Sequence, residues 1–257
     1  MNSRIESFHK IERHFFSLIS TTLLSLEGLQ ACSSGVPIST LNPVFYSGKS
    51  HLLGTEIYQC KRFYESHSVP WALMVPDYLS DTKTDNVLAQ SGFLSIDQGV
   101  AMYLSIRDLG MPGLESDLLI KRMDNEMQTW ILPTVPAFES TEEIAQIYRV
   151  RHQEAIEKSS DIYHFSGFVQ EQIVCSLTLT VMGDSARIDD VATFPKHQKK
   201  GYATQLILSV LQILKDTNIS WCFLEASADG LNIYKKIGFH ELFKNLYYEE
   251  QYQYEQN

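Results

Sequence analysis

The chain has 257 residues, a formal net charge of −10 and 44% apolar residues, which suits one long or two ordinary globular domains. The acidic balance excludes a general nucleic-acid-binding protein, because contacts to phosphates need a basic face. No stretch reaches the roughly 20 apolar residues of a membrane span, so no membrane partner is expected. The four cysteines lack metal-type spacing, and we expect buried, reduced thiols in a cytoplasmic protein.

The N-terminal half mixes helical and strand patterns. Residues 4–30 carry apolar side chains at helical spacing and predict one or two helices. The apolar segment 15–26 vaguely resembles a signal peptide, but Glu6 and Glu12 before it favour a packing helix. The further elements predicted are a helix over 55–68, a strand over 69–76, a short helix over 85–93 closed by a glycine, a strand over 100–106 and a proline-punctuated linker over 130–138.

The C-terminal half begins with a helix, for which Ser140 and Glu143 form a capping-box pattern. In the strand predicted over 186–194 the alternation slips at the pair Asp189-Asp190, which is typical of a β-bulge. The other predicted elements are strands over 163–169, 172–182 and 220–227, a helix over 201–215, a short helix that closes on Gly238 and a last hairpin in the tyrosine-rich tail. Strands and helices without strict alternation indicate an α+β fold.

The segment from 194 to 214 places positive charge and a glycine at the start of a helix. A predicted strand ends at Phe194 and leads into that helix, whose first turn has about four N–H groups without intrahelical partners. Gly201 lets an anion approach the backbone, Ala203 keeps the next turn small, and Lys199 and Lys200 add positive charge. The pattern predicts a phosphate site built from main chain.

The spacing Gln198-x-x-Gly201-x-Ala203 resembles the acyl-CoA-binding signature of the GNAT superfamily of N-acyltransferases, which is Gln or Arg, two residues, Gly, one residue, and Gly or Ala. Residues 189–204 look like the strand–loop–helix of that family, and residues 224–239 look like its second block, a strand and a short helix ending in Gly-Phe. The resemblance implies a mixed, mostly antiparallel sheet flanked by helices, acetyl-CoA as co-substrate and no metal.

The resemblance also implies a set of site residues. In the family, the bulged strand presents its backbone to the pantetheine arm, the loop amides hold the pyrophosphate, and a tyrosine of the short helix protonates the leaving thiolate. Tyr234 matches that tyrosine, although its apolar neighbours also permit a packed aromatic. The matching cofactor-binding positions are Val191, Ala192, Thr193, Gln198, Lys199, Lys200, Gly201, Tyr202, Ala203, Thr204 and Tyr234.

The attacking amine must be neutral, so a group near the bulge must accept a proton. Asp189, Asp190 and Glu225 are the candidate carboxylates, and Asp190 is the first choice. In the alternative, one aspartate only stabilises the bulge and the other is solvated. His197 is expected to be a surface residue of the loop.

The first half resembles a second, degenerate copy of the same fold, as in tandem GNAT proteins. Residues 69–106 look like its later strand–helix–strand part, but no loop signature occurs between 45 and 65, where Glu56 would repel phosphate. We therefore expect a degenerate domain over 1–135 and a catalytic domain over 136–257. An independent helical scaffold is the alternative for the first half.

The leading hypothesis is an acetyl-CoA-dependent N-acetyltransferase that acts on a primary amine of a small molecule, an amino acid or a peptide. The alternative from another class is a non-catalytic CoA-binding regulatory or interaction protein. Transfer to a hydroxyl group, or of a longer acyl chain, also stays open. The partners expected are the amine or peptide acceptor and no nucleic acid, and the chain is expected to be a monomer or a homodimer.

Overall fold

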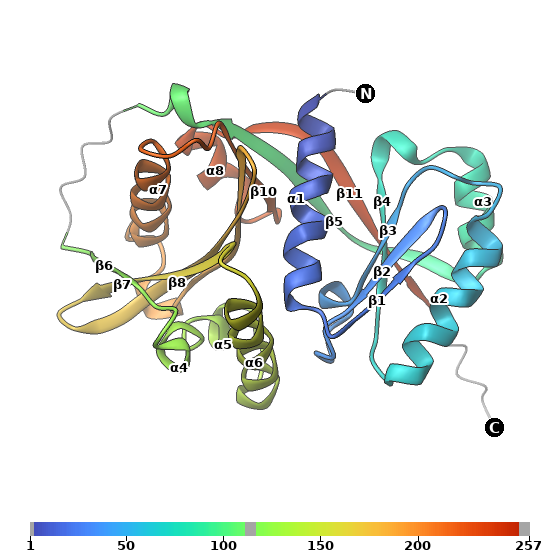
Figure 1. Cartoon of the computed structure of the whole chain (residues 1–257), viewed down its shortest axis with the longest axis horizontal. Coiled ribbons are helices and arrows are strands. Elements are labelled where there is room, and N and C mark those ends of the chain that lie inside the picture. The colour runs from blue at the N-terminus through green and yellow to red at the C-terminus, as the bar shows by residue number, and fades with distance from the viewer. Residues whose placement is uncertain (1–2, 111–116, 252–257) are drawn as a thin grey trace. The chain divides into compact units, whose positions relative to one another are not determined.

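The computed structural model of the protein describes residues 3–110 and 117–251 (Figure 1). By their contacts they form two compact units: unit 1 is Met1–Ile19 with Ala101–Leu242, and unit 2 is Ser20–Val100 with Phe243–Asn257. Both are mixed α+β structures with mostly antiparallel strands flanked by helices, which confirms the predicted fold class.

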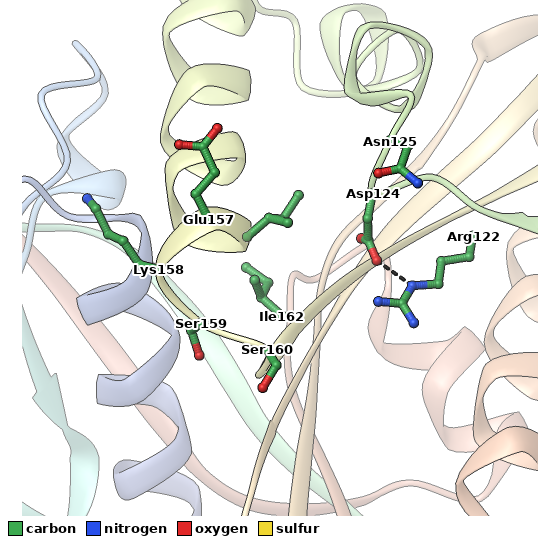
Figure 2. Close-up of a pocket in the computed structure, with 9 residues that line it drawn as sticks. Arg122, Asp124, Asn125, Glu157, Lys158, Ser159, Ser160 and Ile162 are labelled. Carbon is green, nitrogen blue, oxygen red and sulfur yellow. Dashed lines mark hydrogen bonds and ion pairs between the residues drawn. The ribbon is translucent and has the colours of Figure 1, made fainter.

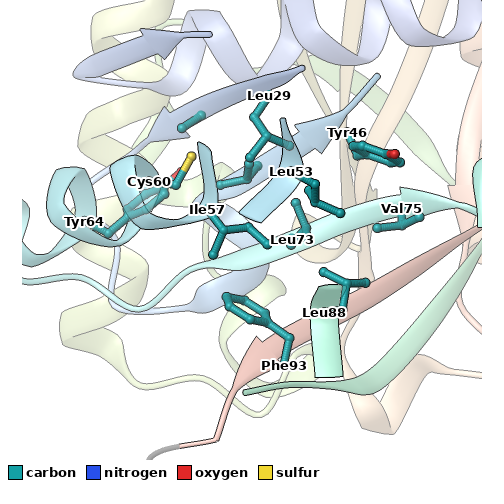
Figure 3. Packing of buried hydrophobic residues seen from close by; sticks show 12 residues of the cluster. Leu29, Tyr46, Leu53, Ile57, Cys60, Tyr64, Leu73, Val75, Leu88 and Phe93 are labelled. Carbon is teal, nitrogen blue, oxygen red and sulfur yellow. The ribbon is translucent and has the colours of Figure 1, made fainter. Parts of the chain in front are cut away.

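Unit 2 contains four short strands, parts of two long strands and two helices. The strands β1 and β2 pair antiparallel, as do β2 and β3, whereas β3 and β4 are parallel and are joined through the helix α2. The element bounds are β1 (Thr22–Ser25), β2 (Leu29–Ser33), β3 (Pro43–Tyr46), α2 (Leu53–His67), β4 (Ala72–Pro76), α3 (Thr82–Gln90), β5 (Phe93–Ser105) and β11 (His240–Glu250), with short 3-10 turns at Ser39–Leu41 and Asp77–Leu79. A cluster of buried side chains from these strands and from α2 and α3 makes the core (Figure 3).

Unit 1 repeats the same order of pairing. The strands β7, β8 and β9 pair antiparallel in turn, and β9 and β10 are parallel and joined through α7. Figure 1 shows α7 on one side of these strands and α4 to α6 on the other. The remaining bounds are α1 (Ser3–Ile19), β6 (Leu119–Arg122), α4 (Met127–Trp130), α5 (Thr134–Ala137), α6 (Glu142–Lys158), β7 (Ile162–Val169), β8 (Gln172–Met182), β9 (Ser185–Thr193), α7 (Tyr202–Leu214), β10 (Trp221–Ala226) and α8 (Leu231–Ile237), with 3-10 turns at Ile106–Asp108 and Pro195–His197.

The units do not follow the linear division expected at residue 135. The helix α1 packs on β8, β9 and α6, with Phe8, Ile11 and Phe15 buried, so the first helix belongs with the later part of the chain. Residues 130–138, expected to be a linker, instead form helical turns of unit 1, and Trp130 is completely buried there.

Three other local expectations were wrong. The helical pattern stops at Ile19, because residues 22–33 form a β-hairpin whose turn amides, those of Glu27 and Gly28, bond to the distant carboxylate of Glu56. The cap of α6 is Thr141 and not Ser140. The described tail is the single strand β11 and not a hairpin. The four cysteines are free and buried, as expected, and no helix in the described ranges is long and apolar enough to cross a membrane.

Asn42 holds together the loop between β2 and β3 from inside unit 2. Its Oδ1 accepts hydrogen bonds from the N–H and hydroxyl of Ser34, at 2.9 and 3.1 Å. Its Nδ2 donates to the carbonyl oxygens of Val36, Ile38 and Pro70, at 2.8 to 2.9 Å. Asn42 is fully buried, so the carboxamide satisfies main-chain groups that water cannot reach.

We therefore expect Asn42→Ala to lower the free energy of unfolding by about 3 kcal/mol, because several buried donors and acceptors lose their partner at once. Urea denaturation measures the loss. The matched control is Asn86→Ala on the exposed side of α3, which should change the free energy by less than about 0.5 kcal/mol. An equal effect of both substitutions would contradict this account.

Candidate active site

The strand β9 carries a β-bulge at the position that the sequence predicted. Ser176 of β8 is opposite Ala192 and Thr178 is opposite Asp189, so one β8 residue faces both Asp190 and Val191. Asp190 has a φ of +54°, a left-handed conformation that costs an L-residue roughly 1–2 kcal/mol. A bulge turns backbone groups out of the ladder.

The strand β9 parts from β10 just before this bulge. Their parallel pairing runs from Ser185 opposite Trp221 to Arg187 opposite Phe223, although β9 continues to Thr193 and β10 to Ala226. Along the described strands, the β9 edge from Ile188 onwards therefore has no β10 residue in register. Such an edge offers main-chain donors and acceptors to a bound molecule.

The loop after β9 exposes a run of main-chain donors. The helix α7 begins at Tyr202, its N-cap is Gly201 with a φ of +84°, and Lys199 has a φ of +61°. None of the N–H groups of residues 199–204 donates a hydrogen bond within the described part of the chain. These donors, next to the positive end of the helix dipole, form a site suited to an anion.

Side chains of the loop add charge and fix its start. Lys196, Lys199 and Lys200 are exposed, and the Gln198 side chain donates to the Thr193 carbonyl at 3.3 Å, which ties the loop to the end of β9. His197 is not the open surface residue that we expected, because both its ring nitrogens are shielded and have no partner among the described residues. Desolvation, then Lys200 and Lys196, lower the pKa of His197, so its ring is neutral.

Tyr234 lies in α8, and its hydroxyl has no hydrogen-bond partner among the described residues. Burial, and then the charge of Asp189, raise the pKa of Tyr234 to about 12, so the phenol keeps its proton at neutral pH. Gly230 makes room for the ring, since a Cβ there would lie 2.9 Å from Tyr234 Cε2. The side chain is therefore a neutral hydrogen-bond donor without an internal acceptor.

The two aspartates of the bulge are both held by internal partners. Asp190 Oδ1 accepts from the Tyr148 hydroxyl at 2.8 Å and Oδ2 accepts from the Thr178 hydroxyl at 2.6 Å. Burial raises the pKa of Asp190, and these two hydrogen bonds oppose the rise. Hydrogen bonds to a charged group are worth about 1.5–3 kcal/mol each, which more than offsets the cost of the left-handed backbone at this residue.

Asp189 is paired and not solvated. Both its oxygens accept from Arg187 Nε, at 2.9 and 3.0 Å, and Arg187 Nη1 lies 3.6 Å from Glu12 of α1. Burial raises the pKa of Asp189 to about 7, although Arg187 lowers it. Glu225, the third candidate, lies on β10 after the pairing with β9 has ended.

Residues 125–239 match the sequence model of the acetyltransferase (GNAT) family. This part of the chain is a GNAT domain. No curated protein sequence matches the chain. Its fold is similar over nearly the whole length to a GCN5-related N-acetyltransferase from Kribbella flavida, with a TM-score of 0.73 and 11% identity over 96% of each chain.

Two further solved structures share the fold. A GCN5-related N-acetyltransferase from Sphaerobacter thermophilus has a TM-score of 0.64 and 14% identity, over 87% of this chain and 76% of that one. A tandem GNAT protein from the clavulanic acid biosynthesis pathway has a TM-score of 0.60 and 13% identity, over 86% and 77%. Together with the repeated strand order of the two units, the second match agrees with a tandem architecture.

In the GNAT domain, the residues predicted for cofactor binding from Val191 to Thr204 fall on one continuous path from the bulge through the loop to the first turn of α7, whereas Tyr234 belongs to α8. Sequence reasoning missed the partners of the aspartates, Tyr148, Thr178 and Arg187, and also Glu12, which faces Arg187. They lie on α6, β8, β9 and α1, and their spacing in the sequence carries no motif. Within the described residues, no group of three histidine, cysteine or acidic side chains is arranged to hold a metal.

A cavity of about 540 Å³ lies at the far end of β9 in the GNAT domain, within the usual size range of small-molecule sites. Its walls are mainly apolar, and two carboxylates and an amide from the first turns of α6 face it. The lining residues are Ile131, Leu132, Val135, Pro136, Glu142, Glu143, Gln146 and Phe194.

Asp189 should make stability depend on pH. Its folded pKa of about 7 lies above the value near 3.9 of an unfolded aspartate. Between these pH values the folded state binds more protons, so the free energy of unfolding falls as pH rises. Asp189→Asn has no titrating carboxyl at this position, so its free energy of unfolding lacks this dependence on pH. The free energy of unfolding of the variant minus that of the wild type should therefore increase from about pH 4 to 7 and level off above pH 7.

Urea denaturation at several pH values between 5 and 8 measures this difference. Asp184→Asn, at an exposed turn of the same unit, is the control and should show no such trend. A constant difference between Asp189→Asn and wild type across the range would refute the buried, proton-binding state of Asp189.

Proposed function

We propose that the chain is an acetyl-CoA-dependent N-acetyltransferase that acetylates a primary amine of a small molecule, an amino acid or a peptide. The observation that carries the proposal is the run of unpaired N–H groups at residues 199–204, next to the splayed edge of β9. Phosphate bound by main chain at a helix N-terminus needs this arrangement.

In this proposal the cofactor follows the path described above. The open amides from Lys199 to Thr204 hold the pyrophosphate, with the side chains of Lys199 and Lys200 adding charge. The free β9 edge at Val191, Ala192 and Thr193 pairs with the pantetheine arm as an added strand would. No step of the chemistry needs a metal.

The thioester of acetyl-CoA supplies an activated acyl group. The backbone N–H near Val191 polarises its carbonyl oxygen, and the acceptor amine attacks the carbonyl carbon. Asp190 takes the proton that the amine loses, through a water molecule. Tyr234 donates its hydroxyl hydrogen bond to the departing thiolate, a role that suits a phenol that stays protonated. The C–S bond breaks as the C–N bond forms, and the thiolate, held by the Tyr234 hydrogen bond, takes a proton from water to become a thiol.

The cavity at the end of β9 supports an amine acceptor over an acidic one. Glu142 and Glu143 place two carboxylates beside apolar walls, and an ammonium group with an apolar substituent complements both features. Which amine fits best is a matter for substrate screening.

We propose that the degenerate copy, which is unit 2, binds no cofactor. Glu56, near the start of α2, accepts hydrogen bonds from Gly28 N–H at 2.9 and 3.1 Å and from Glu27 N–H at 3.0 Å. Its buried carboxylate places negative charge by the helix start that corresponds to α7, where an incoming phosphate would be repelled. The four buried free thiols support a cytoplasmic setting.

One observation favours a second candidate, a non-catalytic CoA-binding regulatory protein. Both carboxylate oxygens of Asp190 already accept internal hydrogen bonds, as they would if this residue only fixed the bulge. Release of free thiol from acetyl-CoA in the presence of pooled amines separates an enzyme from a regulator.

Wild-type protein should bind one equivalent of acetyl-CoA in isothermal titration calorimetry, and Gly201→Glu should weaken the binding about 10²-fold, equivalent to about 2.7 kcal/mol. The added carboxylate repels the diphosphate, and the side chain strains the left-handed backbone. Gln172→Glu, which adds the same charge at an exposed strand end, should bind normally. Binding of two equivalents, or none, in folded wild-type protein would contradict the proposal.

Tyr234→Phe should lower kcat by about 10²-fold, because the thiolate loses its donor, and should leave the affinity for acetyl-CoA nearly unchanged. A thiol-release assay measures kcat, and calorimetry measures affinity. Tyr58→Phe is the control, since Tyr58 is 61% exposed in unit 2. Full activity of Tyr234→Phe would exclude the tyrosine from the reaction.

A further inference from the structure

Four titratable side chains of unit 1 lie in a row that starts at the bulge of β9. Asp190 Oδ2 lies 3.7 Å from His152 Nε2, His152 Nδ1 lies 2.8 Å from His164 Nε2, and His164 Nδ1 lies 3.0 Å from Asp124 Oδ1. Both imidazole rings are 0% exposed, and Trp130 packs against both. The two rings therefore lie in the core of the unit without contact to solvent.

The row has three gaps, each of which lies between two proton-binding atoms of neighbouring side chains that one hydrogen bond could join. Two neutral imidazoles carry one N–H each, so they fill two of the three gaps with a hydrogen bond and leave one empty. The distances identify the empty gap, because 3.7 Å between Asp190 and His152 is too long for a hydrogen bond while 2.8 and 3.0 Å are not. In agreement, His152 Nε2 is a buried nitrogen without a hydrogen-bond partner.

Burial favours this proton-poor state of the rings, since it lowers the pKa of His152 well below its ordinary value. Burial also raises the pKa of Asp190, so this carboxylate binds a proton more readily than a solvated aspartate does, whereas the His152 ring stays neutral. The other charged or titratable groups that face the row from the elements around it are Tyr148 on α6, Arg187 and Asp189 on β9, Glu12 on α1 and Arg122 on β6.

The far end of the row reaches the surface. Asp124 accepts hydrogen bonds from the N–H of His164 and from Arg122, and it lines a cavity of about 580 Å³ between β6 and the end of α6. Figure 2 shows Asp124 and Arg122 on one side of this cavity and Glu157 on the other. Asp124 is 10% exposed at this cavity, so a positive charge on His164 would have both a carboxylate and nearby solvent to stabilise it.

We propose that the whole row from Asp190 to Asp124, and not Asp190 alone, accepts the proton of the acceptor amine. The N–H bond of the ammonium breaks and a proton binds Asp190 Oδ2 through a water molecule. It moves on to His152 Nε2 while His152 gives its Nδ1 proton to His164 Nε2. His164 becomes an imidazolium beside Asp124, and all three gaps are filled. After the products leave, the same transfers in reverse return the proton to water at the bulge.

This inference rests on the proposed acetyl transfer. His152, His164 and Asp124 do not touch the acceptor in it, so they are positioning residues that act through Asp190. Their effect is to move the positive charge away from the attacking amine, which lets the amine stay neutral during the attack.

The decisive variant is Asp124→Asn. The amide removes the negative charge that stabilises the imidazolium, which lowers the affinity of the row for the proton by about one pH unit or more. The acidic limb of the pH profile of kcat/KM should therefore move to lower pH, and kcat should fall about tenfold. Glu157→Gln, at an exposed carboxylate lining the same cavity, is the matched control and should leave both unchanged.

Nitrogen-15 spectra of histidine in the wild-type protein give a readout without turnover. At pH 8 both buried rings should carry hydrogen on Nδ1 and none on Nε2, as the distances along the row require. Hydrogen on Nε2 of His152 at pH 8 would overturn the proposal. An unchanged pH profile in Asp124→Asn, when the wild-type enzyme is active, would also overturn the proposal about the row, but it would leave the proposed function intact. A wild-type protein that transfers no acetyl group would overturn both.

Discussion

The conformation of β9 at Asp190 is the constraint on which the rest of the site depends. A left-handed backbone at a non-glycine residue is unfavourable, and it persists here because Tyr148 and Thr178 each donate a short hydrogen bond to the buried carboxylate. Those donors come from a helix and a neighbouring strand. The packing of α6 and β8 around Asp190 therefore maintains the bulge.

The bulge has consequences on both sides of the strand. Towards β10, the pairing ends at Arg187, and the free edge leads without interruption into the loop whose N–H groups have no internal partners. Towards α6, Asp190 is the first residue of the buried row that continues through His152 and His164. One local distortion thus joins an anion-binding end, where the cofactor is proposed to bind, to a proton-binding core.

The helices α7 of unit 1 and α2 of unit 2 have corresponding places in the strand order, but the main-chain and charged groups at their N-terminal ends differ. In unit 1, the amides before and within the first turn of α7 are open. In unit 2, the carboxylate of the buried Glu56 of α2 accepts hydrogen bonds from the N–H groups of Glu27 and Gly28 in the hairpin turn. The same strand order is therefore compatible with open amides at the helix start in one copy and with an internal contact of a carboxylate in the other.

The sequence alone determined the features that depend on neighbours along the chain. These include the main strands and helices of the GNAT domain, the bulge at Asp189-Asp190 and the phosphate-type loop ending at Gly201, since periodicity, turn residues and helix-end chemistry are local. Only the tertiary structure decided that the first helix joins the later part of the chain and that residues 22–33 form a hairpin. It also decided the partners of the aspartates. Buried charges are satisfied by groups far away in the sequence, and no spacing rule records which residues packing will bring together.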